Sequence, residues 1–287
     1  MSQNLLNLSH LKEQDILELI ELANNFKSEG LIEYRHENLF PDKKVASIFC
    51  EPSTRTKLSF EIAACNLGAK FIDFNIENSS IQKGETLEDT IEAMMLMGID
   101  LCILRHSDSA IHELAKAFPE MQFINAGEGS IAHPSQALLD LMTIQESKEA
   151  FKDLKITIVG DLDHSRVVSS FLEAIQIVGY KSITFCGHPD LCKTFLENPV
   201  GNFEPELNTA LQDADVVIAL RIQNERLTEK LSISASDYVE RYQINVDSLQ
   251  VASPDMILLH PGPVNFGIEL NKEVSDLENC KIKNQIF

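Results

Sequence analysis

The chain lacks a long hydrophobic run and any excess of positive charge. No apolar stretch in the 287 residues approaches the ~20 residues that span a bilayer, and the first residues do not resemble a signal peptide. Lysine and arginine total 24, against 44 aspartates and glutamates, which gives a formal net charge of −20. We therefore expect neither a membrane nor a nucleic acid as partner, because nucleic-acid phosphates bind basic surfaces.

Several common site motifs are also missing. There is no CxxC pair and no HExxH, so no zinc site is expected, and neither GxxxxGK[ST] nor GxGxxG is present to bind a nucleotide. Of the six cysteines, Cys50, Cys65 and Cys102 lie in or beside apolar segments, and we expect them to be small buried hydrophobes. That usage predicts a reducing, cytoplasmic location.

What the chain does have is a regular alternation of short apolar runs and stretches with helical spacing. The predicted strands are 44–50, 69–75, 99–104 and 121–126, then 154–161, 181–187, 214–220 and 256–260; the predicted helices are 57–67, 86–97, 134–148 and 165–179. Such alternation predicts an α/β fold with parallel sheets flanked by helices. The pattern restarts after 134–150, which predicts two consecutive units.

Apolar residues share one face of several predicted helices. Leu58 lies on one face with Ile62 and Cys65, and Leu87 with Ile91, Met94 and Met95. In 134–148, Leu138, Leu141 and Met142 are expected to point inward.

Polar clusters follow the predicted strands. They are Ser53–Thr56, Arg105 with His106, His133 with Gln136, Asp161–Arg166, Arg221–Gln223 and His260–Pro263. Ligands of open α/β sheets bind outside the carboxyl ends of the strands. We therefore expect these clusters to converge on one cleft between the two units.

The sequence Ser53-Thr54-Arg55-Thr56 stands where a strand gives way to a helix. An arginine fork, hydroxyl groups and the N–H groups of a helix start together suit a phosphate. A helix N-cap beside a solvated arginine is the alternative, and this stretch alone leaves both open.

Other clusters have a functional and a structural interpretation. Lys83 lies in a polar loop before a helix, where a solvated lysine is the usual finding, and His133 either donates to a reacting carbonyl or caps a helix. Arg221 and Gln223 stand two apart after a strand, so both side chains can face one carboxylate. In HPGPVNFG the prolines restrict the backbone, and its carbonyl groups can then accept from an amino group.

Six motifs occur along the chain in this order: STRTxxSFE, KGET, RH after a strand, HPxQ, RxQxER and HPxP. Together they closely resemble the catalytic chains of the aspartate carbamoyltransferase family, and the resemblance covers about residues 5 to 287. STRT with HPxQ marks transcarbamoylases in general. Ornithine enzymes have HCLP where this chain has His260–Pro263, and an aspartate- and serine-rich motif at Arg221 and Gln223. The resemblance therefore implies aspartate as the amino acid, because arginines attract its two carboxylates and repel the ammonium of ornithine.

The resemblance also implies a fold and a set of roles. Two Rossmann-like domains are expected, 1–134 binding carbamoyl phosphate and 135–269 binding aspartate, with a C-terminal helix at about 270–287 packing back on the first. The implied contacts are Ser53, Thr54, Arg55 and Thr56 to the phosphate; Arg105, His133 and Thr56 to the carbonyl oxygen; Gln136 and the carbonyls of Pro261 and Gly262 to the amino group; Arg166 and Arg221, with Gln223 beside them, to aspartate; and Ser79 and Lys83 reaching in from a neighbouring subunit.

The implied reaction belongs to pyrimidine biosynthesis and takes place in a homotrimer with shared active sites. It needs no metal or organic cofactor, and regulatory chains or a dihydroorotase are possible further partners. A carbamoyltransferase for another amino acid, such as ornithine, and a non-catalytic scaffold are the alternatives. The chain departs from the family at Phe266, where an arginine is common, and it stops short of the usual family end.

Overall fold

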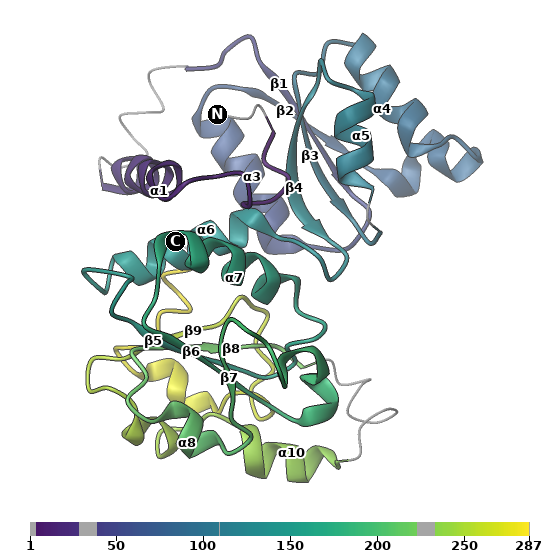
Figure 1. Cartoon of the computed structure of the whole chain (residues 1–287). Helices are drawn as coiled ribbons and strands as arrows, with labels where there is room; N and C mark the ends of the chain where they lie inside the picture. The colour runs from purple at the N-terminus through teal and green to yellow at the C-terminus, as the bar shows by residue number, and fades with distance from the viewer. Residues whose placement is uncertain (1–3, 29–38, 109, 223–232, 287) are drawn as a thin grey trace. The chain divides into compact units, whose positions relative to one another are not determined.

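The computed structural model describes residues 4–28, 39–108, 110–222 and 233–286. It divides the chain into two compact units, Met1–Ser135 and Gln136–Phe287, next to the boundary expected after residue 134 (Figure 1). Each unit contains one all-parallel sheet, so the predicted α/β class with two sheets is confirmed. Among the described residues, no helix has the length and apolar content needed to cross a bilayer.

The first unit has a four-stranded sheet in the order β2-β1-β3-β4. Its strands are β1 (Lys44–Phe49), β2 (Lys70–Phe74), β3 (Leu101–His106) and β4 (Gln122–Glu128); its helices are α1 (Glu13–Ser28), α3 (Thr54–Asn66), α4 (Leu87–Leu96) and α5 (Ile111–Ala117), with 3₁₀ turns η1 (Ile76–Asn78) and η2 (Ser80–Lys83). All four strands were predicted, whereas α1 and α5 were not.

Helices cover both faces of this sheet. Ile91 of α4 and Leu114 of α5 belong to one apolar cluster with Leu104 of β3, whereas Ala64 of α3 packs with Ile103 on the opposite face (Figure 1). Neighbouring strand residues point to opposite faces, so β3 contributes to both clusters. The predicted sheet flanked by helices is therefore confirmed for this unit.

The apolar face of α3 does not point at the sheet. Leu58 and Ile62 are 50% and 54% exposed, and Cys65 is exposed as well. Cys50 is exposed too, so the prediction of burial is wrong for these two cysteines and confirmed for Cys102. The spacing of Leu58, Ile62 and Cys65 defines a common face, but the small Ala64 occupies the buried side of the helix.

The second unit has a five-stranded sheet in the order β7-β6-β5-β8-β9. Its strands are β5 (Lys155–Val159), β6 (Ser182–Cys186), β7 (Asn202–Phe203), β8 (Val216–Ala219) and β9 (Ile257–Leu259); its helices are α6 (Pro134–Gln145), α7 (Arg166–Val178), α8 (Leu207–Leu211) and α10 (Ala235–Tyr242), with 3₁₀ turns η3 (Pro189–Leu191), η4 (Lys193–Phe195), η5 (Ser248–Val251) and η6 (Lys272–Asp276). In Figure 1, α7 lies on one face of this sheet and α8 and α10 on the other. Of these elements, β7, α8 and α10 were not predicted.

Helix α6 buries a different set of residues from the one expected. Leu141 is buried as predicted, whereas Leu138 and Met142 are only half-buried. Asp140 is fully buried on the same helix. A buried carboxyl group needs hydrogen-bond donors, and the side chains that donate to Asp140 are described with the candidate site below.

The C-terminal helix expected over 270–287 is absent from the described residues of that segment, and the prediction is wrong. η6 is a 3₁₀ turn, after which Cys280 forms an isolated parallel bridge with Leu258 of β9. The Leu258 N–H donates to the Asn279 carbonyl (2.9 Å), and the Lys281 N–H donates to the Leu258 carbonyl (2.8 Å). These backbone groups pair with the edge strand of the second sheet, so they are not available for helical hydrogen bonds.

Both sheets have a point where the strand order reverses, between β1 and β3 in the first and between β5 and β8 in the second. Such switch points are the usual ligand sites of open parallel sheets, at the carboxyl ends of the strands. Four predicted clusters follow these strands: the Ser53–Thr56 stretch after β1, Arg105 with His106 at the end of β3, Asp161–Arg166 after β5, and Arg221 after β8.

Candidate active site

The start of α3 has the geometry of an anion site. Ser53 occupies the N-cap position in an extended conformation, and Thr54, Arg55 and Thr56 form the first turn. Within the described part of the chain, the Ser53 side chain makes no capping hydrogen bond. The N–H groups of a first helical turn and the positive end of the helix dipole favour a bound anion. The structure therefore favours the phosphate interpretation over simple capping.

Arg105 is brought to this helix start by the register of the sheet. It pairs with Phe49, the last residue of β1, and its guanidinium donates to the Ser53 Oγ (3.2 Å) and to the Ala126 carbonyl (3.4 Å). Its Nε also lies 3.3 Å from a carboxylate oxygen of Glu51, and only 12% of its side chain is exposed. A largely buried arginine side chain thus lies beside the start of α3 in the first unit. Glu51, which directly precedes Pro52 and Ser53, was not predicted.

The loop that carries Ser79 and Lys83 is well defined. The Ser79 Oγ donates to the Ile76 carbonyl (2.8 Å), and Lys83 ends η2 with an exposed side chain. Gly84 adopts φ +98°, which permits the turn, and Thr86 is the N-cap of α4, where the predicted helix 86–97 begins. The Ser79 hydrogen bond stays within the loop, and Lys83 is accessible to a second molecule.

His133 and Gln136 flank the start of α6. His133 is buried, with its Nδ1 3.3 Å from the Ser135 Oγ. Gln136 is half-buried, and its Nε2 donates to the Asp140 Oδ1 at 2.9 Å. Both residues therefore have positions fixed by neighbouring polar groups.

Asp140 is a buried carboxyl group next to Gln136 that the sequence analysis missed. Burial raises the pKa of this carboxyl group from 3.8 to about 7, against the opposing effect of hydrogen bonds from Gln136 and Gln285. The Gln285 Nε2 donates to the same Oδ1 at 2.7 Å, whereas Oδ2 finds no partner among the described residues. The sequence did contain a signal for this contact, because Gln136 and Asp140 are four residues apart and residues at this spacing lie on one face of a helix.

The HPG segment after β9 is organised around a buried imidazole. The Nδ1 of His260 accepts from the Gly262 N–H (2.8 Å), so Nε2 carries the proton and faces Glu269 Oε1 at 3.3 Å. The Asn265 N–H donates to the same carboxylate oxygen at 2.6 Å. Pro261 and Gly262 are half-buried. Their backbone is thus held at both ends by the His260 ring and by Glu269.

The two arginines expected to bind aspartate follow neighbouring strands. Arg166 is the first residue of α7, after β5, and Arg221 follows β8 with an exposed side chain. Gly160 at the end of β5 has φ +130°, and a Cβ there would lie 2.8 Å from the Leu220 carbonyl oxygen. The two strand ends therefore approach closely where these loops begin. Gln223 lies outside the described residues.

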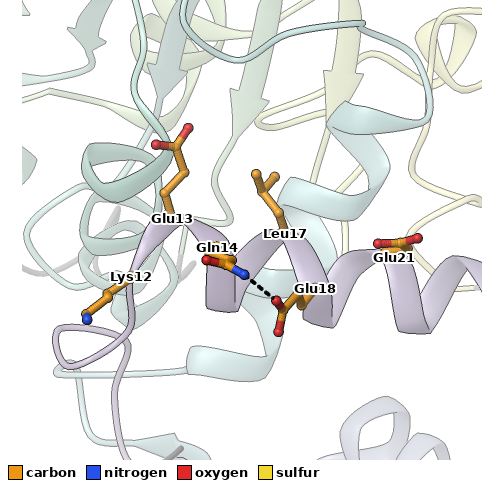
Figure 2. Close-up of a pocket in the computed structure, with 6 residues that line it drawn as sticks. All are labelled: Lys12, Glu13, Gln14, Leu17, Glu18 and Glu21. Carbon is orange, nitrogen blue, oxygen red and sulfur yellow. Dashed lines mark hydrogen bonds between the residues drawn. The ribbon is translucent and has the colours of Figure 1, made fainter.

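A pocket of about 500 Å³ at the start of α1 contains none of these residues. It is lined by Lys12, Glu13, Gln14, Leu17, Glu18 and Glu21, as Figure 2 shows. Three carboxylates against one ammonium group repel an anion, so this pocket does not suit a phosphate or a dicarboxylate. Among the described residues, no group of three or more His, Cys, Asp or Glu is placed to hold a metal ion.

Comparison with protein families assigns both units. Residues 3–146 match the family described as "Aspartate/ornithine carbamoyltransferase, carbamoyl-P binding domain", and residues 152–286 match its "Asp/Orn binding domain". The chain belongs to the aspartate/ornithine carbamoyltransferase family. Its carbamoyl-P binding domain contains the α3 helix start and Arg105, and its Asp/Orn binding domain contains Arg166 and Arg221.

Relatives within this family are similar over almost the whole chain. The aspartate carbamoyltransferase catalytic subunit of Koribacter versatilis is 40% identical over 286 residues, which cover 99% of this chain and 92% of the relative. The catalytic subunit of Coxiella burnetii is 39% identical over 288 residues, with coverages of 99% and 91%. The resemblance to aspartate carbamoyltransferase catalytic chains is thereby confirmed.

Solved structures give the same result. Aspartate transcarbamoylase from Trypanosoma cruzi in complex with carbamoyl phosphate and aspartate matches with a TM-score of 0.88 and 28% identity, over 99% of this chain and 92% of that chain. The same enzyme in complex with carbamoyl aspartate and phosphate matches with a TM-score of 0.85 and 28% identity, over 99% and 90%. The two-domain fold of this chain is therefore that of an aspartate transcarbamoylase.

Proposed function

We propose that this protein is an aspartate carbamoyltransferase, which converts carbamoyl phosphate and L-aspartate into N-carbamoyl-L-aspartate and phosphate. The observation that carries the proposal is the Arg105 guanidinium hydrogen-bonded to Ser53 at the start of α3. This geometry occurs in a chain whose relatives at 39–40% identity are aspartate carbamoyltransferase catalytic subunits. The reaction is a step in the synthesis of pyrimidines.

The start of α3 is the proposed phosphate site. Ser53, Thr54 and Thr56 supply hydroxyl groups, the first helical turn supplies N–H groups, and Arg55 supplies a fixed positive charge. The overall charge of −20 repels anions, so binding depends on such a local concentration of donors.

The carbamoyl group is held by a different set of side chains. Arg105, His133 and Thr56 are the proposed donors to its carbonyl oxygen. Gln136 and the backbone carbonyls of Pro261 and Gly262 are the proposed acceptors for its amino group. Donors at the oxygen and acceptors at the nitrogen fix the orientation of the planar carbamoyl group.

Aspartate is the proposed second substrate because the second unit supplies arginines. Arg166 and Arg221 start from neighbouring strands and match the two carboxylates, and Gln223 is the proposed neighbour of Arg221. The ammonium group of ornithine would be repelled at the same place, which disfavours the ornithine alternative.

The chemistry follows from these contacts. The aspartate amine attacks the carbamoyl carbon, a C–N bond forms, and negative charge grows on the carbonyl oxygen that Arg105 faces. The C–O bond to phosphate then breaks, Arg55 stabilises the leaving phosphate, and the phosphate accepts the proton that the amine loses. Donors placed on a developing oxyanion each contribute ~10²–10³ in rate, and holding two anions together supplies proximity.

The first test is the choice of amino acid. With carbamoyl phosphate present, we expect phosphate release to be about 10³-fold faster with L-aspartate than with L-ornithine, because the proposed arginines attract the side-chain carboxylate of aspartate and repel the side-chain ammonium of ornithine. The carbamoylated product is identified by mass spectrometry, and a reaction without amino acid is the control. Equal rates with the two amino acids, or no product from either, would contradict the proposal.

We also propose a homotrimer in which Ser79 and Lys83 complete the site of a neighbouring copy. The exposed apolar face formed by Leu58 and Ile62 supports this assembly, since solvent-exposed apolar patches of this kind mark contact surfaces.

We further propose a cytoplasmic location, because all six cysteines are free thiols, as expected in a reducing compartment.

A shared site predicts complementation between two inactive variants. Lys83→Ala and Arg55→Ala are each expected to be nearly inactive alone, whereas an equal mixture that has exchanged subunits should recover about a quarter of wild-type activity. A quarter is expected because a site is intact only when each of its two contributing copies is of the right kind. Each variant taken alone through the same dissociation and reassembly is the control. Absence of recovery after exchange has been verified by mass spectrometry would rule out a shared site.

A further inference from the structure

The amide group of Gln136 has a defined direction in this structure. Its Nε2 donates to the Asp140 Oδ1 at 2.9 Å, one helical turn further along α6. The Asp140 Oδ1 accepts from this group and from the Gln285 amide, so the Gln136 amide presents its NH₂ side to Asp140. The Gln136 carbonyl oxygen is thereby directed away from Asp140, where it is available as an acceptor.

A second amide joins Asp140 to the HPG segment. The Gln285 Nε2 donates to the Asp140 Oδ1 at 2.7 Å, and the Gln285 Oε1 accepts from the backbone N–H of His260 at 2.9 Å. Asp140, His260 and Gln285 are all at least nine-tenths buried. Hydrogen bonds among buried groups hold their partners firmly, because breaking one leaves a polar group without a partner or water.

Asp140 and Gln285 thus connect two elements that are distant in the sequence, α6 and the loop after β9. Gln136 belongs to the first element, and Pro261 and Gly262 belong to the second. Under the proposed function, these three residues supply the three acceptors for the amino group of carbamoyl phosphate. Acceptors must be held within about 0.5 Å of their best positions to be effective.

We propose that Asp140 is a positioning residue that, together with Gln285, aligns the acceptors for the amino group of carbamoyl phosphate. Asp140 fixes the direction of the Gln136 amide, and Gln285 keeps the HPG segment in register with α6. Without Asp140, the Gln136 amide turns freely and presents its NH₂ group to the substrate for part of the time, where it repels the amino group. This inference rests on the proposed function, since it concerns the same substrate.

A purely structural role predicts a different result. If Asp140 served only to hold α6 in place, its removal would lower stability and disturb binding of both substrates alike. A positioning role predicts an effect on carbamoyl phosphate that depends on Gln136. The kinetics of the two substrates and a double-mutant cycle separate these roles.

The experiment compares Asp140→Leu, which removes the acceptor, with Asp140→Asn, which keeps an Oδ1 acceptor for both amides. We expect Asp140→Leu to raise the KM for carbamoyl phosphate about tenfold, the size of one lost hydrogen bond, and the KM for aspartate less than about twofold. Asp140→Asn should restore the KM for carbamoyl phosphate to within about twofold of wild type. Thr143→Val is the matched control. It removes a different buried polar group of α6, the hydroxyl that donates to the Leu139 carbonyl, and should change neither KM.

The double-mutant cycle uses Gln136→Met with and without Asp140→Leu. Asp140 acts through Gln136 as well as through Gln285, so once Gln136 is absent Asp140→Leu should raise the KM for carbamoyl phosphate by no more than the about threefold effect expected for Gln285→Leu. An equally large effect in both backgrounds, or equal rises in the two KM values, would overturn the inference.

A second variant keeps the inference testable if Asp140→Leu does not fold. Gln285→Leu leaves Asp140 in place and is expected to raise the KM for carbamoyl phosphate about threefold; an unchanged KM would overturn the proposed alignment. If the wild-type chain forms no carbamoyl aspartate, the proposed function itself fails. If the wild type is active and the variants match it, only the present inference fails.

Discussion

Replacing Arg55 with alanine is expected to lower kcat/KM for carbamoyl phosphate by about 10²–10³-fold while the chain stays folded. Arg55 lies in the first turn of α3 with an exposed side chain, so its removal takes little from the folded state. The substrate, in contrast, loses the guanidinium that offsets the charge of its phosphate. The loss should be larger than for a surface ion pair, because the molecule as a whole is strongly acidic.

Lys57→Ala is the matched control for this experiment. Lys57 lies two residues further along the same helix, and its ammonium group pairs with Asp73 at 2.7 Å. Removing it changes the net charge by the same amount as Arg55→Ala. We expect less than about a threefold change in kcat/KM for Lys57→Ala, because Lys57 is not among the proposed substrate contacts. The partly exposed ion pair that this variant loses contributes at most about 1 kcal/mol to the stability of the fold. Similar losses in the two variants would show that general charge, rather than the position of Arg55, supports activity.

Asp140→Asn is expected to make the free energy of unfolding less dependent on pH. Burial raises the pKa of Asp140 from 3.8 to about 7, so the folded state favours the neutral acid. Above about pH 4 the unfolded chain ionises at this residue and the folded chain does not, so the wild type loses stability as the pH rises towards 7. Asparagine does not ionise and escapes this loss.

The free energy of unfolding of Asp140→Asn, minus that of wild type, is expected to rise by about 3 kcal/mol from about pH 5 to pH 8. Urea unfolding at several pH values measures that difference, and the other titrating groups cancel because both proteins contain them. Glu92→Gln is a suitable control, since Glu92 is exposed on α4. Parallel pH profiles for Asp140→Asn and wild type would show that Asp140 ionises equally in the folded and unfolded chains.

Local patterns predicted the elements that carry the site. The strands β1, β3, β5, β8 and β9 all lie within the predicted ranges or within two residues of them, because short apolar runs record burial on both faces of a parallel sheet. The polar stretch after β1 was recognised from residue types that suit a helix start. Shorter or more polar elements, such as β7 and α8, carry too few residues for a periodic signal.

Sequence periodicity was insufficient for the faces of α3 and α6. Spacing identified Leu58 and Ile62 as neighbours on one helix, but it contained no information on whether the sheet or the solvent lies opposite them. It likewise did not reveal that Asp140 is buried with Gln285, which is 145 residues away along the chain. Burial of this kind depends on which elements pack together, and packing is a property of the folded chain.

By itself, the sequence determined the alternation of strands and helices, the family, and the order of the polar clusters at the strand ends, because each of these is written in residues close together along the chain. Only the tertiary structure decided that Arg105 meets Ser53, that Asp140 joins Gln136 to Gln285, and that the segment after residue 270 pairs with β9 instead of forming a helix. Those outcomes depend on strand register and on competition for buried hydrogen-bond partners between distant segments, which no local pattern contains.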